Sequence, residues 1–509
     1  MFDAVRQAGG GIVTIPSGTY LLPGKSPIAL CDHTHIQATG AIFLLPERLG
    51  NQARVTLFAG ENLQDFAWTG GEFRGHVFDP DAETNVGEPN VSTRMIVVTT
   101  TPGGTTRGLL FRDLRAYDVA GSIVGVFGAS KAKSESDVET FAEDVTVENC
   151  VLLTSGKFMW DYGYLWQILV WPEDYAERHR RLADKYFPQE LIRAVRVGAD
   201  GDDRVMLENA QRPLPIAKTA TARDALVFFG DALPKNIRRG KQYFIVTSEE
   251  TFIRIAETPG GTPIRFDGAF GPQAKSIHDH FRAYQALYAP LGSGPGKGAV
   301  DLVACRDVRV SGCKLSARGD TMHIQKSRNI VFANNQILGS RMGAFFLAEY
   351  CRNAVVTGNT VDGTNGSRVM SVEKSCADVT IVGNTFRNGG RGSWINQPSN
   401  FILRGNVFVD NTTKCAPDPR RGRKTFLTGD YETYPELYFT LHQPQGEYDG
   451  VIVDGNIFET GAHGGPAIRF AEHGSRIVVT NNVFKGEHRT IDMPASNQIV
   501  RIEGNLGTE

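Results

Sequence analysis

The stretches VVTGN (355–359), TIVGN (380–384) and ILRGN (402–406) decide the fold, because each joins a β-branched run to a two-residue step of Gly and Asn. Related steps end at Cys150, Cys313, Asn335, Asn359, Asn384, Asn406, Asn456, Asn482 and Asn505. Successive gaps after Cys313 are 22, 24, 25, 22, 50, 26 and 23 residues. A strand and a turn that recur at such a period are typical of a solenoid in which each unit stacks on the next. The gap of 50 is two periods, or one period with a long loop.

The two residues of the step are expected to have different roles. The first is always Gly or Asn, residue types that tolerate a positive φ, so we expect a left-handed bend between two strands there. The second is mostly Asn, and equivalent side chains in neighbouring coils lie about 4.8 Å apart. Their amides can therefore hydrogen-bond along the stack. The sequence predicts an all-β chain folded as a parallel β-helix, with an internal Asn ladder that has Cys at its leading end.

Size and composition fit one elongated domain with an addition. A compact core normally divides in a chain of 509 residues, whereas a solenoid extends its core along one axis. A net charge of −2 and a pI of about 6.6 offer no basic surface for nucleic acid. No apolar run approaches the ~20 residues of a membrane span. We expect neither a nucleic-acid partner nor a membrane span, and the sequence leaves the oligomeric state open.

Seven cysteines cannot all pair with one another. Cys351 and Cys376 align one coil apart, and parallel neighbours lie about 5 Å apart, so both a disulfide and two stacked buried thiols suit this spacing. No C-x-x-C or H-E-x-x-H pattern occurs, and we therefore expect no metal site from these motifs.

The ladder skips 163 residues between Cys150 and Cys313, and this gap predicts an inserted module. Residues 163–195 have the apolar spacing of one or two helices, and the segments that follow resemble the short strands of a small β-barrel or sandwich. We divide the chain into residues 1–165 (N-terminal cap and first coils), residues 166–298 (inserted α+β module) and residues 299–509 (main coils).

The opening GGGIVTIPSGTYLL (9–22), followed by HIQATGAIFLL (35–45), resembles the start of pectin-lyase-like right-handed parallel β-helix proteins. The G-N steps extend the resemblance over most of the chain outside the insertion. It implies carbohydrate chemistry, because this architecture houses polysaccharide lyases, glycoside hydrolases, epimerases, esterases and phage tailspikes. It also implies a periplasmic or secreted protein whose signal peptide has been removed ahead of Phe2.

Within that group the chain is most similar to β-helical glycosidases with a β-rich insertion, such as α-galactosidases that act on blood-group-type glycans. RGDTMHIQ (318–325) resembles their acidic segment, which carries two adjacent Asp where this chain has Gly319 and Asp320. YPEL (434–437) is similar to another of their stretches, although the insertion sits differently in the chain. The likeness implies a glycoside hydrolase with a poly- or oligosaccharide substrate.

Aligning the coils by their ladder residues predicts which side chains face outward. In that alignment Thr321 and His323 point inward, whereas Asp320 and Glu373 lie on the outward face two coils apart, roughly 10 Å between backbones. Inverting glycosidases hold their two carboxyls about 6.5–9.5 Å apart. We therefore predict inverting hydrolysis with Asp320 as general acid and Glu373 as general base, or the reverse, and Glu349 as a further candidate. The structural alternative is a surface ion pair of Glu373 with Lys326 or Arg469.

The segment KFMWDYGYLWQILVWPEDY (157–175) aligns beside the coil of Asp320 when Cys150 and Cys313 are superposed. Aromatic faces stack on the apolar faces of sugar rings, although these aromatics could equally attach the inserted module to the solenoid. The candidate substrate-binding residues are Trp160, Tyr162, Tyr164, Trp166, His323, Lys326, Arg341 and Arg469, with Asp161 as a reserve catalytic carboxylate.

Two other functions stay open. MHIQKSRNIVF (322–332) and SVEKSCADVTIVGNTF (371–386) resemble the Lys-Ser segment of β-helical alginate and chondroitin lyases. That likeness implies β-elimination on a uronate-containing glycan, with Lys326 or Lys374 as base, an arginine from Arg341, Arg368 or Arg391, and Ca²⁺ held by Glu349, Glu373 and an Asn. A hydrolase would need no cofactor. The third function is a non-catalytic glycan-binding β-helix, which the large insertion beside an acidic groove disfavours.

Overall fold

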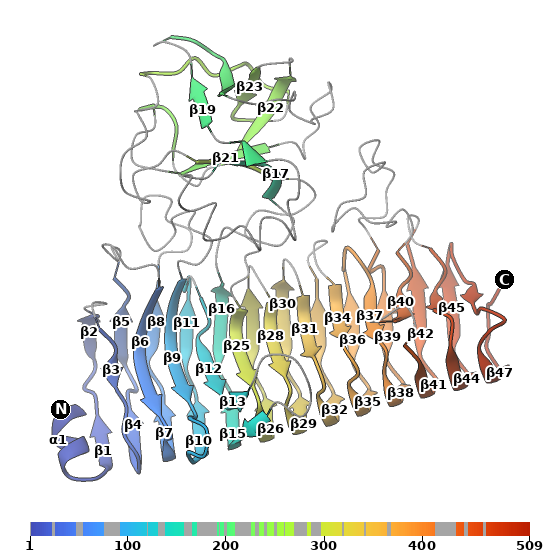
Figure 1. Cartoon of the computed structure of the whole chain (residues 1–509), viewed down its shortest axis with the longest axis horizontal. Coiled ribbons are helices and arrows are strands. Elements are labelled where there is room, and N and C mark those ends of the chain that lie inside the picture. Colours follow the sequence, from blue (N-terminus) through green and yellow to red (C-terminus); the bar gives the residue numbers. More distant parts are fainter. Residues whose placement is uncertain are drawn as a thin grey trace.

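The computed structural model of the chain describes residues 2–22, 26–46, 54–75, 92–119, 121–130, 138–156, 165–170, 191–192, 194–197, 201–208, 225–229, 234–238, 242–248, 252–258, 260–268, 282–286, 297–317, 320–340, 343–363, 368–412, 434–441, 446–461 and 465–509. Nearly all regular structure in these residues is strand, and their one helix, α1 (Phe2–Gln7), precedes the first coil (Figure 1). They contain no helix whose length and hydrophobicity would suit a membrane crossing.

Each coil contributes one strand to each of three parallel sheets, in the order A, B, C (Figure 1). Sheet A comprises β1 (Gly11–Thr14), β4 (Thr34–Gln37), β7 (Gln64–Thr69), β10 (Thr106–Arg112), β15 (Ala142–Glu148), β26 (Cys305–Ser311), β29 (Arg328–Ala333), β32 (Arg352–Thr357), β35 (Ala377–Val382), β38 (Ser399–Arg404), β41 (Tyr448–Asp454), β44 (Gly474–Thr480) and β47 (Gln498–Glu503). Neighbouring strands are one coil apart in the chain, except where β26 follows β15 across the insertion. The predicted parallel β-helix is confirmed.

Sheet B has strands of three to five residues and lies next to sheet A around each coil. It comprises β2 (Gly18–Leu21), β5 (Ala41–Leu44), β8 (Glu72–Arg74), β11 (Arg115–Tyr117), β16 (Val151–Ser155), β27 (Lys314–Ala317), β30 (Gln336–Ser340), β33 (Thr360–Asp362), β36 (Thr385–Arg387), β39 (Val407–Val409), β42 (Ile457–Thr460) and β45 (Val483–Gly486). Its inward phenylalanines Phe386, Phe408, Phe458 and Phe484 stack at 4.9–5.3 Å between centroids, because identical positions repeat from coil to coil.

Sheet C closes each coil. It comprises β3 (Ile28–Ala29), β6 (Arg54–Glu61), β9 (Ser92–Thr99), β12 (Val124–Phe127), β25 (Lys297–Val303), β28 (Asp320–Gln325), β31 (Gly343–Ala348), β34 (Arg368–Val372), β37 (Ser393–Asn396), β40 (Leu437–Thr440), β43 (Ile468–Phe470) and β46 (Ile491–Asp492). A short antiparallel hairpin, β13 (Ala129–Ser130) and β14 (Val138–Thr140), follows β12 before the chain returns to sheet A.

The internal ladder forms as predicted. The Nδ2 of each Asn from Asn335 to Asn482 donates to the Oδ1 of the next at 2.9–3.1 Å, and this oxygen also accepts the backbone N–H of the preceding Asn. The residue before each ladder position has a φ of 54–66° at all nine steps. Asn406 bonds directly to Asn456, so the gap of 50 residues is one coil with a long connection.

A second row of left-handed residues, which was not predicted from the sequence, lies five positions before the first. Asp307, Asn329, Asn353, Asp378 and Asn400 have φ values of 50–56°, and Asn or Asp side chains again bond from coil to coil on the surface. Both rows flank the straight part of each sheet A strand, so a fixed length separates the two bends. An Asp or Asn lies five residues before six of the nine Gly or Asn steps, and this was the available signal. The last three steps have Gly450, Arg476 and Ile499 at that position, also with positive φ.

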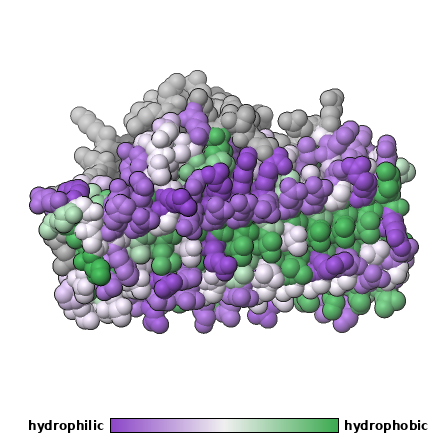
Figure 2. Space-filling view, turned by 90° about the horizontal axis from the view of Figure 1, so that it is seen from below, coloured by the Kyte–Doolittle hydropathy of each residue, from purple (hydrophilic) through white to green (hydrophobic). Residues whose placement is uncertain are grey.

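Sheet A lies along the lower side of Figure 1, and its outward positions are apolar over several coils. Register places Val331, Val355, Ile402, Ile452 and Val478 in one outward row with Thr380. Seen from below, hydrophobic residues gather along this part of the solenoid (Figure 2). This part of sheet A therefore offers few outward polar side chains for binding or catalysis.

The inserted module forms its own sheet of eight strands between β16 and β25. Its order is β18 (Leu191–Ile192), β17 (Leu165–Val170), β24 (Arg282–Ala286), β21 (Ala225–Phe229), β22 (Gln242–Ser248), β23 (Phe252–Ala256), β20 (Val205–Glu208) and β19 (Ala194–Val197). Arg193 alone separates the two edge strands in the chain, so the sheet must curl until its edges approach, as in a barrel. The helices expected over 163–195 are wrong for β17, β18 and β19, whose backbones pair in this sheet; residues 171–190 lie outside the described part.

Cys351 and Cys376 are free, buried thiols, as are Cys150, Cys305 and Cys313. Each thiol bonds to backbone carbonyls of its own or the preceding coil; Cys351 Sγ, for example, lies 3.3 Å from the carbonyl oxygen of Ile324. Of the two arrangements that suited the spacing of Cys351 and Cys376, the structure has the stacked thiols.

The internal ladder should be worth more than the surface one. We expect Asn384→Ala to lower the free energy of unfolding by about 3 kcal/mol or more, because it leaves buried donors of Asn359 unsatisfied. Asn400→Gly, which removes an exposed ladder amide and keeps the positive φ, should cost less than about 1 kcal/mol. Urea unfolding of the two variants compares them, and equal costs would contradict a structural role for the buried row.

A buried acid near the long connection should make stability pH-dependent. Glu436 is 1% exposed, and burial raises its pKa to about 8, although the Asn411 backbone N–H and amide donate to its two oxygens at 2.7 and 2.9 Å. A carboxyl whose pKa is raised on folding stabilises the fold fully below its unfolded pKa of about 4.5 and loses that contribution as pH rises towards about 8.

We expect Glu436→Gln, whose side chain is neutral at every pH, to remove this dependence, so that it matches the parent at about pH 4 and is more stable than the parent at about pH 9. Glu459→Gln, an exposed change on β42, is the control and should not alter the slope. Unfolding midpoints across this range measure the effect, and parallel curves for all three proteins would rule it out.

Candidate active site on sheet C

Long connections gather at the corner between sheets B and C. From β7 onward, each turn from sheet A to sheet B has two residues, whereas the corner from sheet B to sheet C holds the inserted module between β16 and β25 and the long connection between β39 and β40. The strands of the inserted module lie above the solenoid in Figure 1. The chain therefore enters sheet C from the inserted module at β25 and from the long connection at β40.

The strands β25 and β28 have an extension at each end. The module enters at the N-terminal end of β25, and the β13–β14 hairpin lies near the C-terminal end of β28, where Lys326 Nζ bonds to Ser130 Oγ at 3.3 Å. Lys326 itself is 5% exposed. A functional site on sheet C is therefore most sheltered on these two strands.

One row of outward side chains crosses sheet C in register, and we call it the outward row. It consists of Asp301, His323, Phe346, Ser371, Trp394, Tyr438, Arg469 and Asp492, on successive strands from β25 to β46. The row combines acids, a histidine, three aromatic rings and an arginine on one face. It runs along the axis of the solenoid.

A buried acid–histidine pair begins the row. Asp301 Oδ1 lies 2.8 Å from His323 Nδ1, and the two side chains are 8% and 6% exposed. The Phe346 ring stacks on the imidazole, with centroids 5.4 Å apart and planes at 19°. A carboxylate at Nδ1 favours the tautomer that is protonated there, which leaves Nε2 to accept a proton. The geometry is that of an oriented general base.

His323 was expected to point inward, and this prediction is wrong. Met322 and Ile324 of β28 pair with Phe345 and Leu347 and fill the core instead. The turn after β28 has two residues, with Lys326 left-handed, whereas the turn after β31 has three, with two left-handed residues in succession. Aligning through the Asn ladder misses this one-residue difference, and a one-residue slip moves every side chain of a strand to the other face.

Asp320 starts β28, three residues before His323, and is 5% exposed. A Cβ atom at Gly343, its neighbour on β31, would lie 2.9 Å from Asp320 Oδ1. Glycine at 343 thus leaves room for the carboxyl at the edge of sheet C. Three residues of strand separate the backbones of Asp320 and His323 by roughly 10 Å.

The predicted pairing of Asp320 with Glu373 is not found. The counterpart of Asp320 two coils on is Arg368, through Gly343, and Glu373 lies five residues further along the strand. The two backbones are therefore roughly 19 Å apart, well beyond the separation of an inverting pair. Glu373 Oε1 instead lies 3.2 Å from an Arg368 guanidinium nitrogen, so the expected alternative of an ion pair is right in kind but not in partner.

An aromatic platform occupies the middle of the outward row. The Arg368 guanidinium lies 3.5 Å from the centroid of the Trp394 ring, whose edge meets Tyr438 with centroids 6.0 Å apart and planes at 83°. Arg469 covers Tyr438 at 5.9 Å and bonds to Asp492 at 3.0 Å. Ser371 is 1% exposed between Phe346 and Trp394, and its Oγ makes no hydrogen bond within the described residues.

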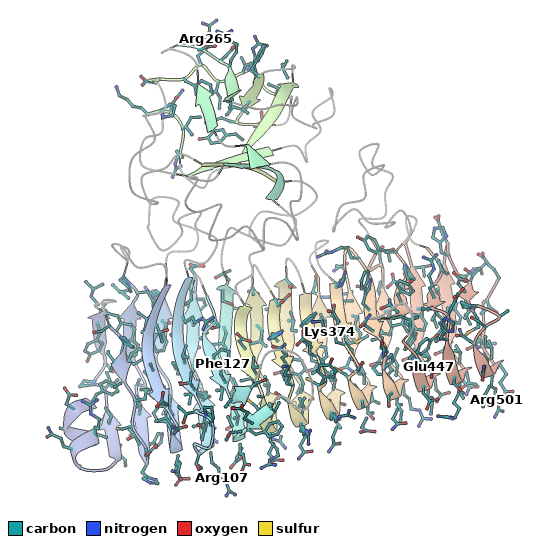
Figure 3. The ribbon with its side chains drawn as sticks, in the orientation of Figure 1. Arg107, Phe127, Arg265, Lys374, Glu447 and Arg501 are labelled. Carbon is teal, nitrogen blue, oxygen red and sulfur yellow. The ribbon has the colours of Figure 1, made fainter. Side chains whose placement is uncertain are left out.

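The remaining acids and lysines near the row are engaged with one another. Glu349 bonds to Lys374 and, at 2.5 Å, to Gln325. Figure 3 shows Lys374 among the middle coils of the solenoid. Within the described residues, no group of three or more His, Cys, Asp or Glu side chains is placed to hold a metal ion. The oxygens proposed for Ca²⁺ on Glu349 and Glu373 are thus both in ion pairs.

Several predicted residues lie outside the described part of the chain, namely Trp160, Asp161, Tyr162, Tyr164 and Arg341. Trp166 is described only by its backbone, in β17 of the inserted sheet. Of the rest, the outward row includes His323 and Arg469, while Lys326 lies just after β28. Asp301, Trp394 and Tyr438 were not predicted from the sequence. Asp301 and Trp394 each lie 12 residues before a ladder residue, Cys313 and Asn406, whereas Tyr438 lies 18 residues before Asn456.

A search of curated proteins found no match in sequence. Solved structures with a similar course include the A-module of mannuronan C-5 epimerase AlgE6 from Azotobacter vinelandii (10% identity, TM-score 0.42, covering 99% of this chain and 92% of that one). Another is PfbA, a surface adhesin of Streptococcus pneumoniae (12% identity, TM-score 0.42, covering 98% and 87%).

A third is an exopolygalacturonase from Thermotoga maritima (10% identity, TM-score 0.31, covering 98% and 86%). Residues 293–418, which hold most of the outward row, match the family model described as "Right handed beta helix region". The three parallel sheets and their internal ladder, together with this match over residues 293–418, show that the chain has the right-handed parallel β-helix fold.

Proposed function

We propose that sheet C is the glycan-binding face of a carbohydrate-active enzyme that cleaves glycosidic bonds by hydrolysis, with proton transfer at Asp301, His323 and Asp320. The outward row is the observation that carries this proposal. It joins a buried acid–histidine pair to aromatic rings on the same face of one sheet.

A glycan suits this face for chemical reasons. Sugar rings have apolar faces that stack on aromatic side chains and hydroxyls that bond to acids, amides and arginines. Phe346, Trp394 and Tyr438 supply rings, and Arg368, Glu373 and Arg469 supply polar groups around them. Because the row follows the solenoid axis, we expect an oligosaccharide to lie along that axis and to meet successive coils.

The chemistry follows from the positions of the three groups. Asp320, as general acid, gives its proton to the glycosidic oxygen as the bond to the anomeric carbon breaks. His323 Nε2 takes a proton from the water that attacks this carbon, while Asp301 stabilises the imidazolium. Roughly 10 Å separate the backbones of Asp320 and His323. Alternation along β28 turns the Asp320 side chain away from the outward row, so its carboxyl must reach the glycosidic oxygen around the start of the strand. Solvent then exchanges the two protons, and a new reducing end is the product.

β-Elimination on a uronate is the second candidate, and a row of cations favours it. Arg368 and Arg391 follow Asp320 and Gly343 across the N-terminal end of sheet C, where they could neutralise a sugar carboxylate. The two lysines expected as base are engaged, Lys374 with Glu349 and Lys326 with Ser130. His323 would then be the base in this reaction as well.

We expect His323→Ala to lower kcat on a cleaved glycan by at least 100-fold and Asp320→Asn by a similar factor, because general acid–base groups contribute about 10²–10⁴. Asp362→Asn, which removes a carboxylate from sheet B, is the matched control and should keep the parent rate. Reducing-end release and the ultraviolet absorbance of unsaturated uronates are followed together on neutral and uronate oligosaccharides. Full activity in His323→Ala would refute the role of His323 as general base. An ultraviolet signal that the parent produces and His323→Ala loses would show that the reaction is β-elimination and not hydrolysis.

Gly343→Ala tests the position of Asp320 without changing its chemistry. A methyl group there would approach Asp320 Oδ1 to 2.9 Å, so the carboxyl must move. We expect kcat to fall about tenfold or more while the unfolding midpoint stays within a few degrees of the parent. An unchanged kcat with an intact fold would show that Asp320 does not act at this place.

A further inference from the structure

A cavity of about 540 Å³ opens on the outer face of sheet B, away from the outward row of sheet C. Arg74, Tyr117 and Leu153 form its wall, in register on β8, β11 and β16. Glu72, Asp118 and Thr154 complete the polar part. The cavity lies at the start of the corner connections that follow β8 and β16. Its size is within the range of about 300–1,000 Å³ typical of small-molecule sites.

The floor of this cavity is held in an uncommon backbone conformation. Thr154 has a φ of 53° and Asp118 a φ of 57°, and a left-handed β-branched residue is a rare outlier. Thr154 Oγ1 donates to the Asp118 carboxylate and accepts the Asp118 backbone N–H at 3.1 Å. The Thr154 backbone N–H donates to Ser316 Oγ at 2.8 Å. Bonds across three coils thus fix both residues, and such strain concentrates at ligand sites.

The same bonds leave polar atoms open towards the cavity. Thr154 engages Asp118 Oδ1, whereas Oδ2 makes no hydrogen bond within the described residues. The Tyr117 hydroxyl likewise has no hydrogen-bond partner among them. Arg74 bonds to Glu72 Oε1 at 2.6 Å, and the two side chains are 55% and 22% exposed. A ring, a hydroxyl, two carboxylate oxygens and a guanidinium therefore line one space.

We propose that this cavity is a second saccharide-binding site, specific for neutral sugars and separate from sheet C. The Tyr117 ring and Leu153 offer an apolar surface for one face of a pyranose, and Asp118, Glu72 and Arg74 accept from or donate to its hydroxyls. Two carboxylates against one guanidinium give a formal charge of −1, which disfavours uronates and phosphates. The proposal does not depend on cleavage at sheet C, since the two sites are on different sheets.

The test uses the full chain with Trp394→Ala, which weakens the sheet C site, and trisaccharides of glucose, galactose and mannose as probes. Saturation-transfer NMR and calorimetry report binding. We expect at least one neutral trisaccharide to bind, Tyr117→Ala to weaken it about tenfold, and Arg115→Ala, an exposed change on the same strand outside the cavity, to leave it unchanged.

Thr154→Gly is a second variant of the cavity that should fold normally, because glycine adopts the positive φ of residue 154 without strain. It should keep the unfolding midpoint and still weaken binding several-fold, since Asp118 loses its hydrogen-bond partner. Absence of binding by every neutral probe, or equal binding by the Tyr117→Ala and parent proteins, would overturn the site. Tighter binding of a trigalacturonate would overturn its preference for neutral sugars. Glycan cleavage is measured separately with the protein that keeps Trp394. A protein that binds neutral sugars but cleaves no glycan would therefore count against the function proposed for sheet C and not against this cavity.

Discussion

The buried row of asparagine amides is the constraint on which the rest of the structure depends. Each amide joins its own coil to both neighbours, through Oδ1 to the preceding coil and through Nδ2 to the next Asn and to a backbone carbonyl. A left-handed residue precedes every one of them, and a second left-handed residue lies five positions earlier. These bends fix the length of sheet A and the sharp turn into sheet B. Variation in coil length is thereby confined to the other two corners.

That confinement explains where chemistry can develop. The turn into sheet B cannot accept insertions without breaking the ladder, whereas the corner between sheets B and C carries the inserted module and the long connection before β40. Both additions border sheet C, which also presents aromatic and charged residues in register. The apolar outward row of sheet A contrasts with it. The fold thus supplies a regular frame, and the loops and outward side chains supply specificity.

The ladder could be predicted because its signals are local, a β-branched run, a Gly or Asn, and an amide at a steady interval. The face of His323 could not, because it depends on whether a corner has two residues or three, and only the pairing of β28 with β31 reveals that. The partner of Glu373 was missed for a related reason, since Arg368 reaches it along the strand and not across coils. Trp394 lies as far before its ladder residue as His323 does, so the same alignment turns it inward by the same one-residue error. Tyr438 could not be placed in this way, because its coil has six more residues before Asn456. Asp301 lies 22 residues before His323, the interval that also separates Cys313 from Asn335, so the ladder alignment places the two in neighbouring coils. Their bond could still not be predicted, because it requires His323 to face outward.

A crystal structure of the His323→Ala protein with a bound oligosaccharide tests the central claim most directly. The account predicts sugar rings over Phe346, Trp394 and Tyr438, with the chain parallel to the solenoid axis and a glycosidic oxygen near Asp320. Sugar bound on another face of the solenoid, with sheet C empty at saturating ligand, would contradict it.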